Sequence, residues 1–275
     1  MNLTTSRYLA AVFVALVTVA LSVATVSAAT TENAVDERGS SRFYEDALKR
    51  FHEGKYRGAA IQLKNALQRN PRSLPARILL GRALNKLRLG SAAENQLKIA
   101  RGAGADDALT LVPLGEAYLT QGKFEILLRE LPPGQRPTVI EAGVRVLRGM
   151  ALLQLRVARE AEQEFNKALK LQPEHVRALI GLASLRLSKG RLKSARALVD
   201  QATKHAPENE NVWHLKGKLR QNIGDWKGAL ENYNRAISLS ENLLSARVDR
   251  AATLLALGRQ KDAAADIEFV RKIIP

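Results

Sequence analysis

The fold is decided by residues 176–207, VRALIGLASLRLSKGRLKSARALVDQATKHAP, whose pattern returns 34 residues later in residues 213–240, WHLKGKLRQNIGDWKGALENYNRAISLS. Gly190 and Gly224 occupy the same place in the two stretches. A fixed period of this length indicates one supersecondary unit that is repeated along the chain. Because each such unit buries its apolar face against its neighbours, we expect the period to extend beyond these two stretches.

The period covers most of the chain. A 34-residue ruler that begins at Ser40 has later marks near residues 74, 108, 142, 176, 210 and 244. Its eighth position is small in every unit: Ala47, Gly81, Gly115, Gly149, Ala183, Gly217 and Ala251. Its twenty-fourth position is larger: Leu63, Leu97, Leu131, Phe165, Val199, Tyr233 and Ile267. Small residues allow two helices to approach closely, and the large residue is expected to fill the space between them.

Glycine and proline mark the turns of each unit. The fifteenth position is glycine in five units: Gly54, Gly122, Gly190, Gly224 and Gly258. Glycine accepts the left-handed conformation in which many helices end. The thirty-second position carries Pro71, Pro173, Pro207 and Pro275. Proline cannot continue a helix, so each unit is predicted to consist of a helix, a tight turn, a second helix and a stop.

This pattern resembles the tetratricopeptide repeat (TPR) family over roughly residues 40–275, and residues 176–207 and 213–240 carry the resemblance most clearly. The resemblance implies an all-α, right-handed superhelical solenoid of about seven helix–turn–helix repeats, which would occupy residues 41–275. Proteins of this family act as binding scaffolds, so a function in protein–protein interaction is implied.

The N-terminus indicates export. Arg7 precedes an uncharged run over residues 8–29, YLAAVFVALVTVALSVATVSAA, and small residues follow near Ala28. This order is typical of a secretory signal that is cleaved after Ala28, which makes residues 1–28 a signal peptide and residues 29–40 a linker. The run is also long enough to be an uncleaved membrane anchor. Both alternatives predict a periodic repeat domain that is periplasmic or secreted, or held at the inner membrane through residues 8–29.

Composition points away from catalysis. The chain contains no cysteine, which excludes disulfides, thiolate metal sites and a cysteine nucleophile. The four histidines are His52, His175, His205 and His214, and none forms a helical zinc motif. Phosphate-binding glycine loops and nucleophile elbows are also absent from the sequence. We therefore expect a non-enzyme that uses no cofactor and no metal.

The first helices of successive repeats should line a concave groove, by resemblance to the TPR family. Positions two, five, nine and twelve of each unit would point into it, which gives an apolar stretch followed by a polar and basic one. Such a groove suits an extended peptide or an amphipathic helix. The candidate partner-binding residues are Val112, Leu119, Val146, Met150, Arg177, Ile180, Asn211, His214, Lys218 and Gln221.

The net charge of +16 can attract acidic proteins, anionic lipids or other polyanions. Basic residues cluster in residues 49–57, 186–196 and 216–220. An export signal and an aromatic content of only 5% argue against nucleic acid. An anionic polysaccharide or lipid is the alternative to a protein partner, and a charged but inactive surface is the simplest explanation. A non-catalytic subunit of an envelope enzyme complex is a further alternative.

A narrower resemblance concerns the exported TPR proteins of bacterial exosortase (PEP-CTERM) and exopolysaccharide systems. It rests on the export signal, on YEDALKRFHEGKYRGAAIQLKNALQRNP at residues 44–71, and on the stretch from residue 79 to residue 131 before a PPGQ break. The resemblance implies a scaffold in polysaccharide assembly or surface-protein sorting. Those proteins are often lipoproteins, but this chain has no cysteine to carry a lipid.

The period is disturbed in two places. Pro132, Pro133 and Pro137 fall where the second helix of the third unit should finish. This predicts a shortened helix followed by an extended connection, and a flexible joint between the third and fourth units is the alternative. The last unit stops at Pro275 with apolar residues on its second helix. It could cap itself, could continue in a longer array, or could be completed by a partner.

Overall fold

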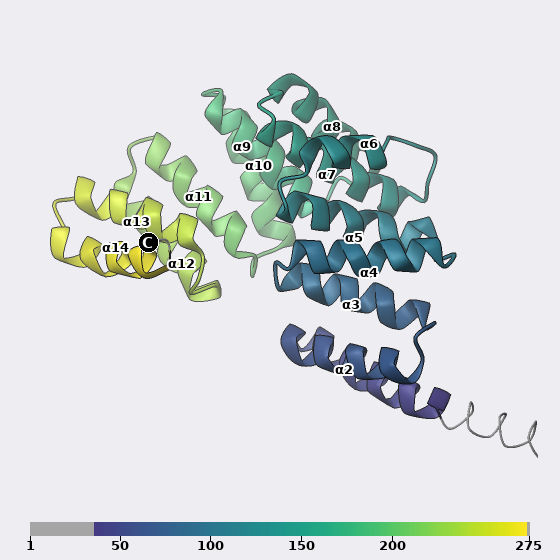
Figure 1. Ribbon diagram of the computed structural model, residues 1–275. Coiled ribbons are helices and arrows are strands. Elements are labelled where there is room, and N and C mark those ends of the chain that lie inside the picture. The colour runs from purple at the N-terminus through teal and green to yellow at the C-terminus, as the bar shows by residue number, and fades with distance from the viewer. Residues whose placement is uncertain (1–35, 274–275) are drawn as a thin grey trace, which may run out of the picture. The chain divides into compact units, whose positions relative to one another are not determined.

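The computed structural model describes residues 36–273, and every regular element within that range is a helix (Figure 1). The predicted all-α class is therefore confirmed for these residues. The chain forms two compact units, of which unit 1 ends at Thr120 and unit 2 begins at Gln121. The predicted signal or anchor of residues 8–29 lies outside the described residues, as does Pro275.

The described part of unit 1 begins with helical residues 36–52, which include residues 36–40 of the predicted linker. Ser40 ties this helix to the next one, because its side chain is buried and its hydroxyl donates a 3.0 Å hydrogen bond to the carbonyl of Ala66. The remaining helices of unit 1 are α2 (Tyr56–Arg69), α3 (Leu74–Lys86), α4 (Gly90–Gly102) and α5 (Asp107–Thr120).

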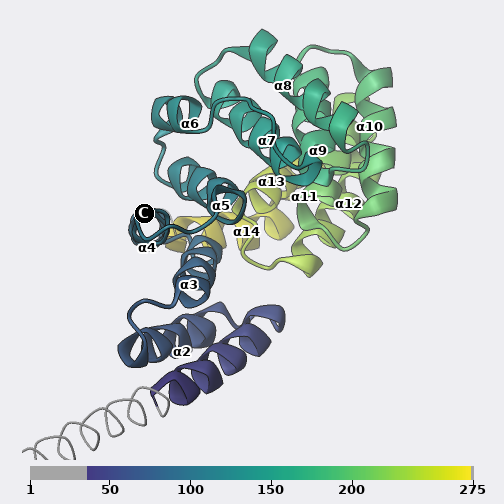
Figure 2. The same cartoon turned by 90° about the vertical axis from the view of Figure 1, so that its right-hand side faces the viewer.

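Unit 2 contains nine of the described helices. They are α6 (Phe124–Glu130), α7 (Thr138–Gln154), α8 (Ala158–Leu171), α9 (Val176–Ser188), α10 (Leu192–His205), α11 (Glu210–Asn222), α12 (Trp226–Leu239), α13 (Leu244–Ala256) and α14 (Gln260–Ile273). Within this unit α7, α9, α11 and α13 are neighbours and lie on the inner side, while α8, α10 and α12 lie outside them (Figure 2). First helices of successive repeats thus form one layer and second helices another.

The eighth and twenty-fourth positions meet as predicted. In unit 2, a Cβ added to Gly149 would lie 2.7 Å from the ring of Phe165, and a Cβ added to Gly217 would lie still closer to the ring of Tyr233. Both aromatic side chains are completely buried. In these two repeats the large side chain therefore fills a space that exists only because the facing helix has no side chain there.

The turns also follow the ruler, but not only through glycine. All five fifteenth-position glycines have a positive φ, between 68° and 79°. The two units without glycine there place arginine in the same conformation, Arg88 at φ 59° and Arg156 at φ 62°. The sequence did not predict this, because a left-handed arginine costs roughly 1–2 kcal/mol. The geometry of the helical hairpin evidently overrides the preference of the residue.

A recurring contact between the two helices of a hairpin was not predicted from the sequence. An arginine at the fourth position of the ruler contacts the twenty-third position, 19 residues later, in three repeats. The pairs are Arg77 with Gln96 at 3.1 Å, Arg145 with Glu164 at 3.2 Å, and Arg247 with Asp266 at 2.8 Å. Glu164 and Asp266 are buried, so each pair joins the two helices of its own hairpin. A search for charged residues at constant separation would have found it.

The proline break produces the expected shortened helix. α6 has 7 residues, whereas α8, α10 and α12 have 14 each. Arg148 on α7 compensates for the lost turn, because its Nη1 donates to the carbonyls of Leu128 and Leu131 at 2.7 and 3.0 Å. These carbonyls would otherwise end the helix without partners.

The segment after α6 is held in place by a buried carboxylate. Glu141, which is 5% exposed, accepts from Nη1 of Arg136 at 2.7 Å, from Nε of Arg145 at 2.7 Å and from the backbone N–H of Gly134 at 3.3 Å. Arg136 also donates to the carbonyl of Pro132. The extended connection is thus tied to the first turn of α7. This contact favours the fixed connection over the flexible joint that the sequence left open.

Glu141→Gln is expected to release this connection. The amide cannot accept from both guanidinium groups as a carboxylate does, and it removes the charge that neutralises them. We expect hydrogen exchange of the Gly134 amide, which donates to Glu141, to become at least about tenfold faster, since local opening should cost at least about 1.4 kcal/mol less. Glu160→Gln, on the exposed side of α8, is the control and should leave the exchange rate unchanged. Equal rates in the two variants would show that Glu141 does not hold the segment.

Candidate functional site

The predicted groove residues divide between the two units. Val112 and Leu119 lie on α5 in unit 1, where both are half-buried. The other eight lie on α7, α9 and α11, the inner helices of unit 2. The candidate groove described below is therefore the inner layer of unit 2 alone.

Val146 belongs to the core rather than to an exposed surface. It is 1% exposed and joins the apolar cluster that contains Phe165, against which Leu128 and Met150 also pack. The ruler places Val146 at the fifth position, but its side chain belongs to a buried cluster with side chains of α8 and α9. A partner in the groove has no access to this residue in the present conformation.

Met150 and Ile180 provide the apolar part of the candidate groove. Both are half-buried, and they lie on neighbouring inner helices, α7 and α9. The guanidinium of Arg177 reaches Met150 across these helices, with Nη2 at 3.6 Å from Sδ. Arg177 is therefore positioned along the groove by a contact between repeats.

Two polar side chains on α11 are fixed by their own contacts. His214 Nε2 lies 2.7 Å from Oδ2 of Asp249 on α13, so this pair joins two successive repeats. Gln221 accepts a 2.7 Å hydrogen bond from the hydroxyl of Tyr233. Burial, with a contribution from the Asp249 charge, raises the pKa of Tyr233 above its usual value, so the hydroxyl remains a donor. The sequence predicted both groove residues but neither intramolecular partner.

Asn211 and Lys218 are the two exposed members of the predicted set. They are seven residues apart, which places them on one side of α11. Asn211 donates to the carboxylate of Glu210 at its own helix start. The ammonium of Lys218 forms no ion pair with the part of the chain that the structure describes. Lys218 is consequently the cation in this groove that is most available to a partner.

Part of the basic cluster at residues 186–196 is neutralised within the protein. Glu162 on α8 is paired with Arg186 at 2.7 Å and with Lys189 at 2.7 Å, and Arg191 is 3.6 Å away. The hydrogen bond from Lys189, assisted by the three positive charges, holds the pKa of Glu162 below its usual value. These cations are committed to joining α8 to the following hairpin and contribute less to recognition than the sequence suggested.

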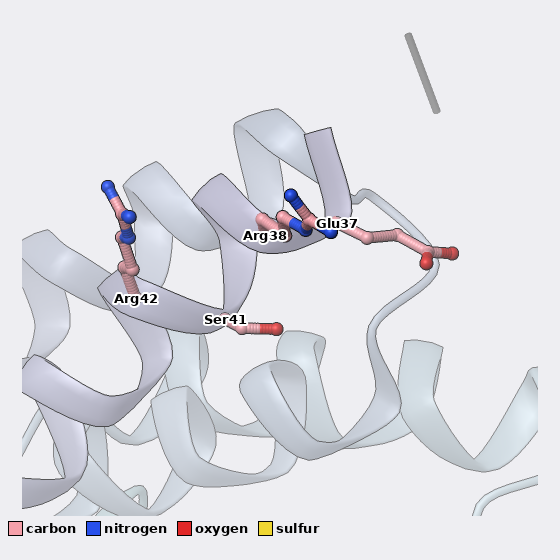
Figure 3. A pocket seen from close by; sticks show the side chains of 4 residues that line it. All are labelled: Glu37, Arg38, Ser41 and Arg42. Carbon is pink, nitrogen blue, oxygen red and sulfur yellow. The ribbon is translucent and has the colours of Figure 1, made fainter. Parts of the chain in front are cut away.

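A shallow hollow beside residues 36–52 is a poor candidate site. Its lining side chains are Glu37, Arg38, Ser41 and Arg42, and they point in different directions (Figure 3). Ligand sites need polar groups that converge on one point. Elsewhere in residues 36–273, no group of three His, Asp or Glu side chains is arranged to hold a metal ion.

No helix described between residues 36 and 273 has the length and apolar character needed to cross a membrane. The predicted attachment through residues 8–29 is not tested by this observation, because it lies before the described range.

Comparison with known proteins supports the TPR architecture. Residues 152–219 match the family model described as tetratricopeptide repeat. These residues extend from α7 through α8, α9 and α10 into α11, and so include most of the candidate groove.

Three curated relatives share parts of the chain. Tetratricopeptide repeat-containing protein trd-1 of Caenorhabditis elegans is 26% identical over 46% of this chain and 17% of its own length. Anaphase-promoting complex subunit 3 of Schizosaccharomyces pombe is 28% identical over 42% of this chain and 17% of its own. Cellulose synthase operon protein C of Xanthomonas axonopodis pv. citri is 25% identical over 71% of this chain and 14% of its own. The chain thus spans less than a fifth of each of these relatives.

Solved structures share the fold. The structure of pilF of Pseudomonas aeruginosa has a TM-score of 0.58 and 19% identity, covering 79% of this chain and 99% of that one. The APC/C hetero-tetramer Cut9-Hcn1 gives a TM-score of 0.64 and 13% identity, covering 89% of this chain and 45% of that one. At these identities the likeness concerns the fold alone.

Proposed function

We propose, from the TPR architecture that this chain shares with these proteins, that it is a non-catalytic scaffold whose inner helices in unit 2 bind a protein or peptide. The observation that carries the proposal is the surface of α11, where exposed Lys218 and Asn211 lie beside two fixed side chains, His214 and Gln221. Because those two are already oriented by Asp249 and Tyr233, a partner would pay little entropy to order them.

The chemistry of this surface favours an acidic or mixed peptide. Lys218 and Arg177 supply positive charge on α11 and α9, and Met150 and Ile180 supply apolar contact on α7 and α9. Such a row suits an extended segment or an amphipathic helix with acidic residues on one flank. Two similar proteins, a subunit of the anaphase-promoting complex and the Cut9-Hcn1 hetero-tetramer, belong to assemblies of several proteins, and this similarity supports the same class of function here.

We further propose that this scaffold lies in the cell envelope of a bacterium, on the side of the inner membrane that faces away from the cytoplasm. The support is the apolar segment of residues 8–29 and the similarity to a cellulose synthase operon protein, which favours a role in exopolysaccharide or envelope assembly. Service as a non-catalytic subunit of an envelope enzyme complex is one form that the role could take. The narrower association with exosortase systems has no support from the comparisons and stays a prediction.

Site-specific crosslinking tests the groove. A photo-reactive amino acid in place of Lys218 in the full chain, expressed in the source cells, should give one discrete crosslinked protein. The same amino acid in place of Lys204, at the exposed end of α10, should not give that product. Identical products from the two positions, or none from Lys218, would refute the groove assignment.

Once that partner is purified, its affinity for groove variants gives the second measurement. Asn211→Ala with Lys218→Glu should weaken binding by at least about tenfold, because an interfacial charge is reversed and a polar contact is lost. Lys204→Glu with Asn242→Ala makes the same two changes at exposed sites away from the groove and should leave affinity unchanged. His214 is kept, since its removal would also separate Asp249 from its partner between repeats.

A further inference from the structure

One edge of unit 2 carries a row of cations that the groove does not use. Each hairpin of this unit turns at the end of its first helix, and the first helices α7, α9, α11 and α13 lie side by side in one layer. Their turns therefore lie along one edge, which we call the hairpin edge. The second residue of each following helix is basic: Arg159 on α8, Lys193 on α10, Lys227 on α12 and Lys261 on α14.

These four side chains recur at the same place in successive repeats, and they are both exposed and without an acidic partner. All four are exposed, and none forms an ion pair with any residue in the range 36–273. In contrast, Arg145, Arg186 and Arg247 all pair with carboxylates inside their own unit. The hairpin edge thus keeps one uncompensated positive charge in each of four successive repeats.

Apolar side chains are exposed on the same edge. Ile223 and Trp226 flank the turn between α11 and α12 and are 50% and 37% exposed. Val157 precedes α8 beside Arg159 and is 36% exposed. Trp226 directly precedes Lys227, so the indole and the ammonium emerge from one turn. A large exposed aromatic beside lysine is costly in water and needs an environment that accepts both groups.

The opposite edge is mixed in charge. The connections between repeats carry Glu174, Glu208 and Glu241, all of them exposed. They lie at the far ends of second helices that have 14 residues, about 21 Å away along the helix axis. Glu174 and Glu208 lie within ion-pair distance of His205 and Arg235, and Lys170 and Lys204 are exposed at the same helix ends, so cations and carboxylates alternate there.

We propose that the hairpin edge of unit 2 docks on the surface of an anionic phospholipid bilayer. Lysine and arginine would face the lipid phosphates, while Trp226, Ile223 and Val157 would enter the interfacial layer. Tryptophan favours that layer because its ring is apolar and its N–H is polar. The opposite edge, where cations and carboxylates alternate, would face away from the membrane. This docking does not depend on the proposed groove, which lies on the inner helices.

The pairing of charge with apolar exposure selects lipid over the other anionic partners. An anionic polysaccharide could neutralise the lysines, but it would give no burial to Ile223 or Val157. An acidic protein could satisfy both groups, and it is distinguished by experiment below. Each basic residue near an anionic bilayer contributes about fivefold to the partition constant, so removing two should lower it about thirtyfold.

Trp226 can report its own contact with lipid. The chain has two tryptophans, so Trp213→Phe in the full chain leaves Trp226 as the single tryptophan, which can be excited selectively over the tyrosines. With vesicles of brominated phosphatidylglycerol and phosphatidylcholine, Trp226 emission should shift to the blue and be quenched. Quenching should fall at high salt and be small with brominated phosphatidylcholine alone. Because the readout concerns Trp226, insertion of residues 8–29 in the same vesicles would not produce it.

Two matched variants decide the role of the cations. Lys193→Glu with Lys227→Glu should reduce the quenching by more than about thirtyfold at limiting lipid, because each change removes a positive charge and adds a negative one. Lys170→Glu with Lys204→Glu changes the charge equally at the opposite ends of α8 and α10 and should retain it. Glutamate is favourable near a helix N-terminus and unfavourable near a C-terminus, so unfolding would penalise the control more than the test variant. The neutral pair Lys193→Gln with Lys227→Gln should give an intermediate loss.

Several outcomes would overturn the proposal. One is an unquenched Trp226 on vesicles that nevertheless sediment with the chain, which would assign attachment to another part of the molecule. Equal quenching in the two charge-reversal variants, or equal quenching by anionic and neutral vesicles, would also refute it. A blue shift of Trp226 emission with an acidic protein but not with vesicles would show that the hairpin edge binds a protein and not lipid.

Discussion

Phe165→Ala is expected to lower the free energy of unfolding of the fourth and fifth repeats by about 3–5 kcal/mol, the usual cost of deleting a buried phenylalanine ring. The ring is completely buried and lies between two glycines, Gly149 on α7 and Gly181 on α9. Neither glycine has a side chain that could move into the space left behind. The cavity should therefore persist, and the loss should fall near the upper end of the range.

The same site predicts an effect that changes sign. In the natural chain, Gly149→Ala should destabilise, because the new Cβ would lie 2.7 Å from Cε1 of Phe165. In the Phe165→Ala background that clash disappears. Alanine is then preferred over glycine inside a helix by roughly 0.5–1 kcal/mol, and its methyl group partly fills the cavity. Gly149→Ala should therefore stabilise the double variant relative to Phe165→Ala.

Urea denaturation and amide hydrogen exchange of the full chain measure both effects. Exchange should accelerate first in α7, α8 and α9, since each repeat in such an array is stabilised mainly by its neighbours. Ile267→Ala is the control, because Ile267 occupies the same ruler position as Phe165 but is 48% exposed, and its loss should cost under about 1 kcal/mol. If Gly149→Ala destabilises the natural chain and the Phe165→Ala variant equally, the ring of Phe165 does not occupy this space.

Asp266→Asn is the second large effect, expected to cost about 3–5 kcal/mol in the last described hairpin. The carboxylate is 0% exposed and accepts from Nη1 of Arg247 at 2.8 Å and from Nε and Nη2 of Arg250 at 2.6 Å. Arg247 also lies over the ring of Phe269, 3.8 Å from its centre. Removing the negative charge leaves two largely buried guanidinium groups facing each other without compensation.

Hydrogen exchange should localise the loss to α13 and α14, while α7 to α9 keep their protection. Asp262→Asn makes the same chemical change four residues earlier, where the side chain is 51% exposed and pairs with Arg259. Its cost should be under about 1 kcal/mol, as for other exposed ion pairs. If the two variants are equally stable, the Asp266 cluster is not important for stability.

The sequence predicts the packing of the repeats well because that packing depends on volume. A small eighth residue and a large twenty-fourth residue are complementary in size, and their periodic recurrence shows which residues meet. Gly217 and Tyr233 confirm this in unit 2, as do Gly149 and Phe165. Turn positions were predicted for the same reason, since glycine usually occupies the left-handed conformation. The left-handed conformation of Arg88 and Arg156 was not predicted, because the hairpin imposes this conformation whatever residue stands there.

The candidate groove was predicted less completely, because exposure depends on residues from neighbouring repeats. Val146 fits the periodic rule for the groove, yet it is buried in a cluster with side chains of α8 and α9. His214 and Gln221 use polar atoms on Asp249 and Tyr233, which are distant in sequence. A period reveals which residues are equivalent. It does not show which hydrogen bonds each one makes, and the pairing of Glu162 with three cations illustrates the same limit.

The shortened helix α6 also constrains the evolutionary history of this array. Arg148 of the following repeat supplies donors to the carbonyls of Leu128 and Leu131, where the helix stops early. A lineage that lost the final turns before acquiring this arginine would have passed through a form with unpaired carbonyls. A lineage that acquired the arginine first would have had a donor ready for them. The order arginine first, truncation second is therefore the accessible route, and ancestors with a full-length helix should already carry arginine at position 148.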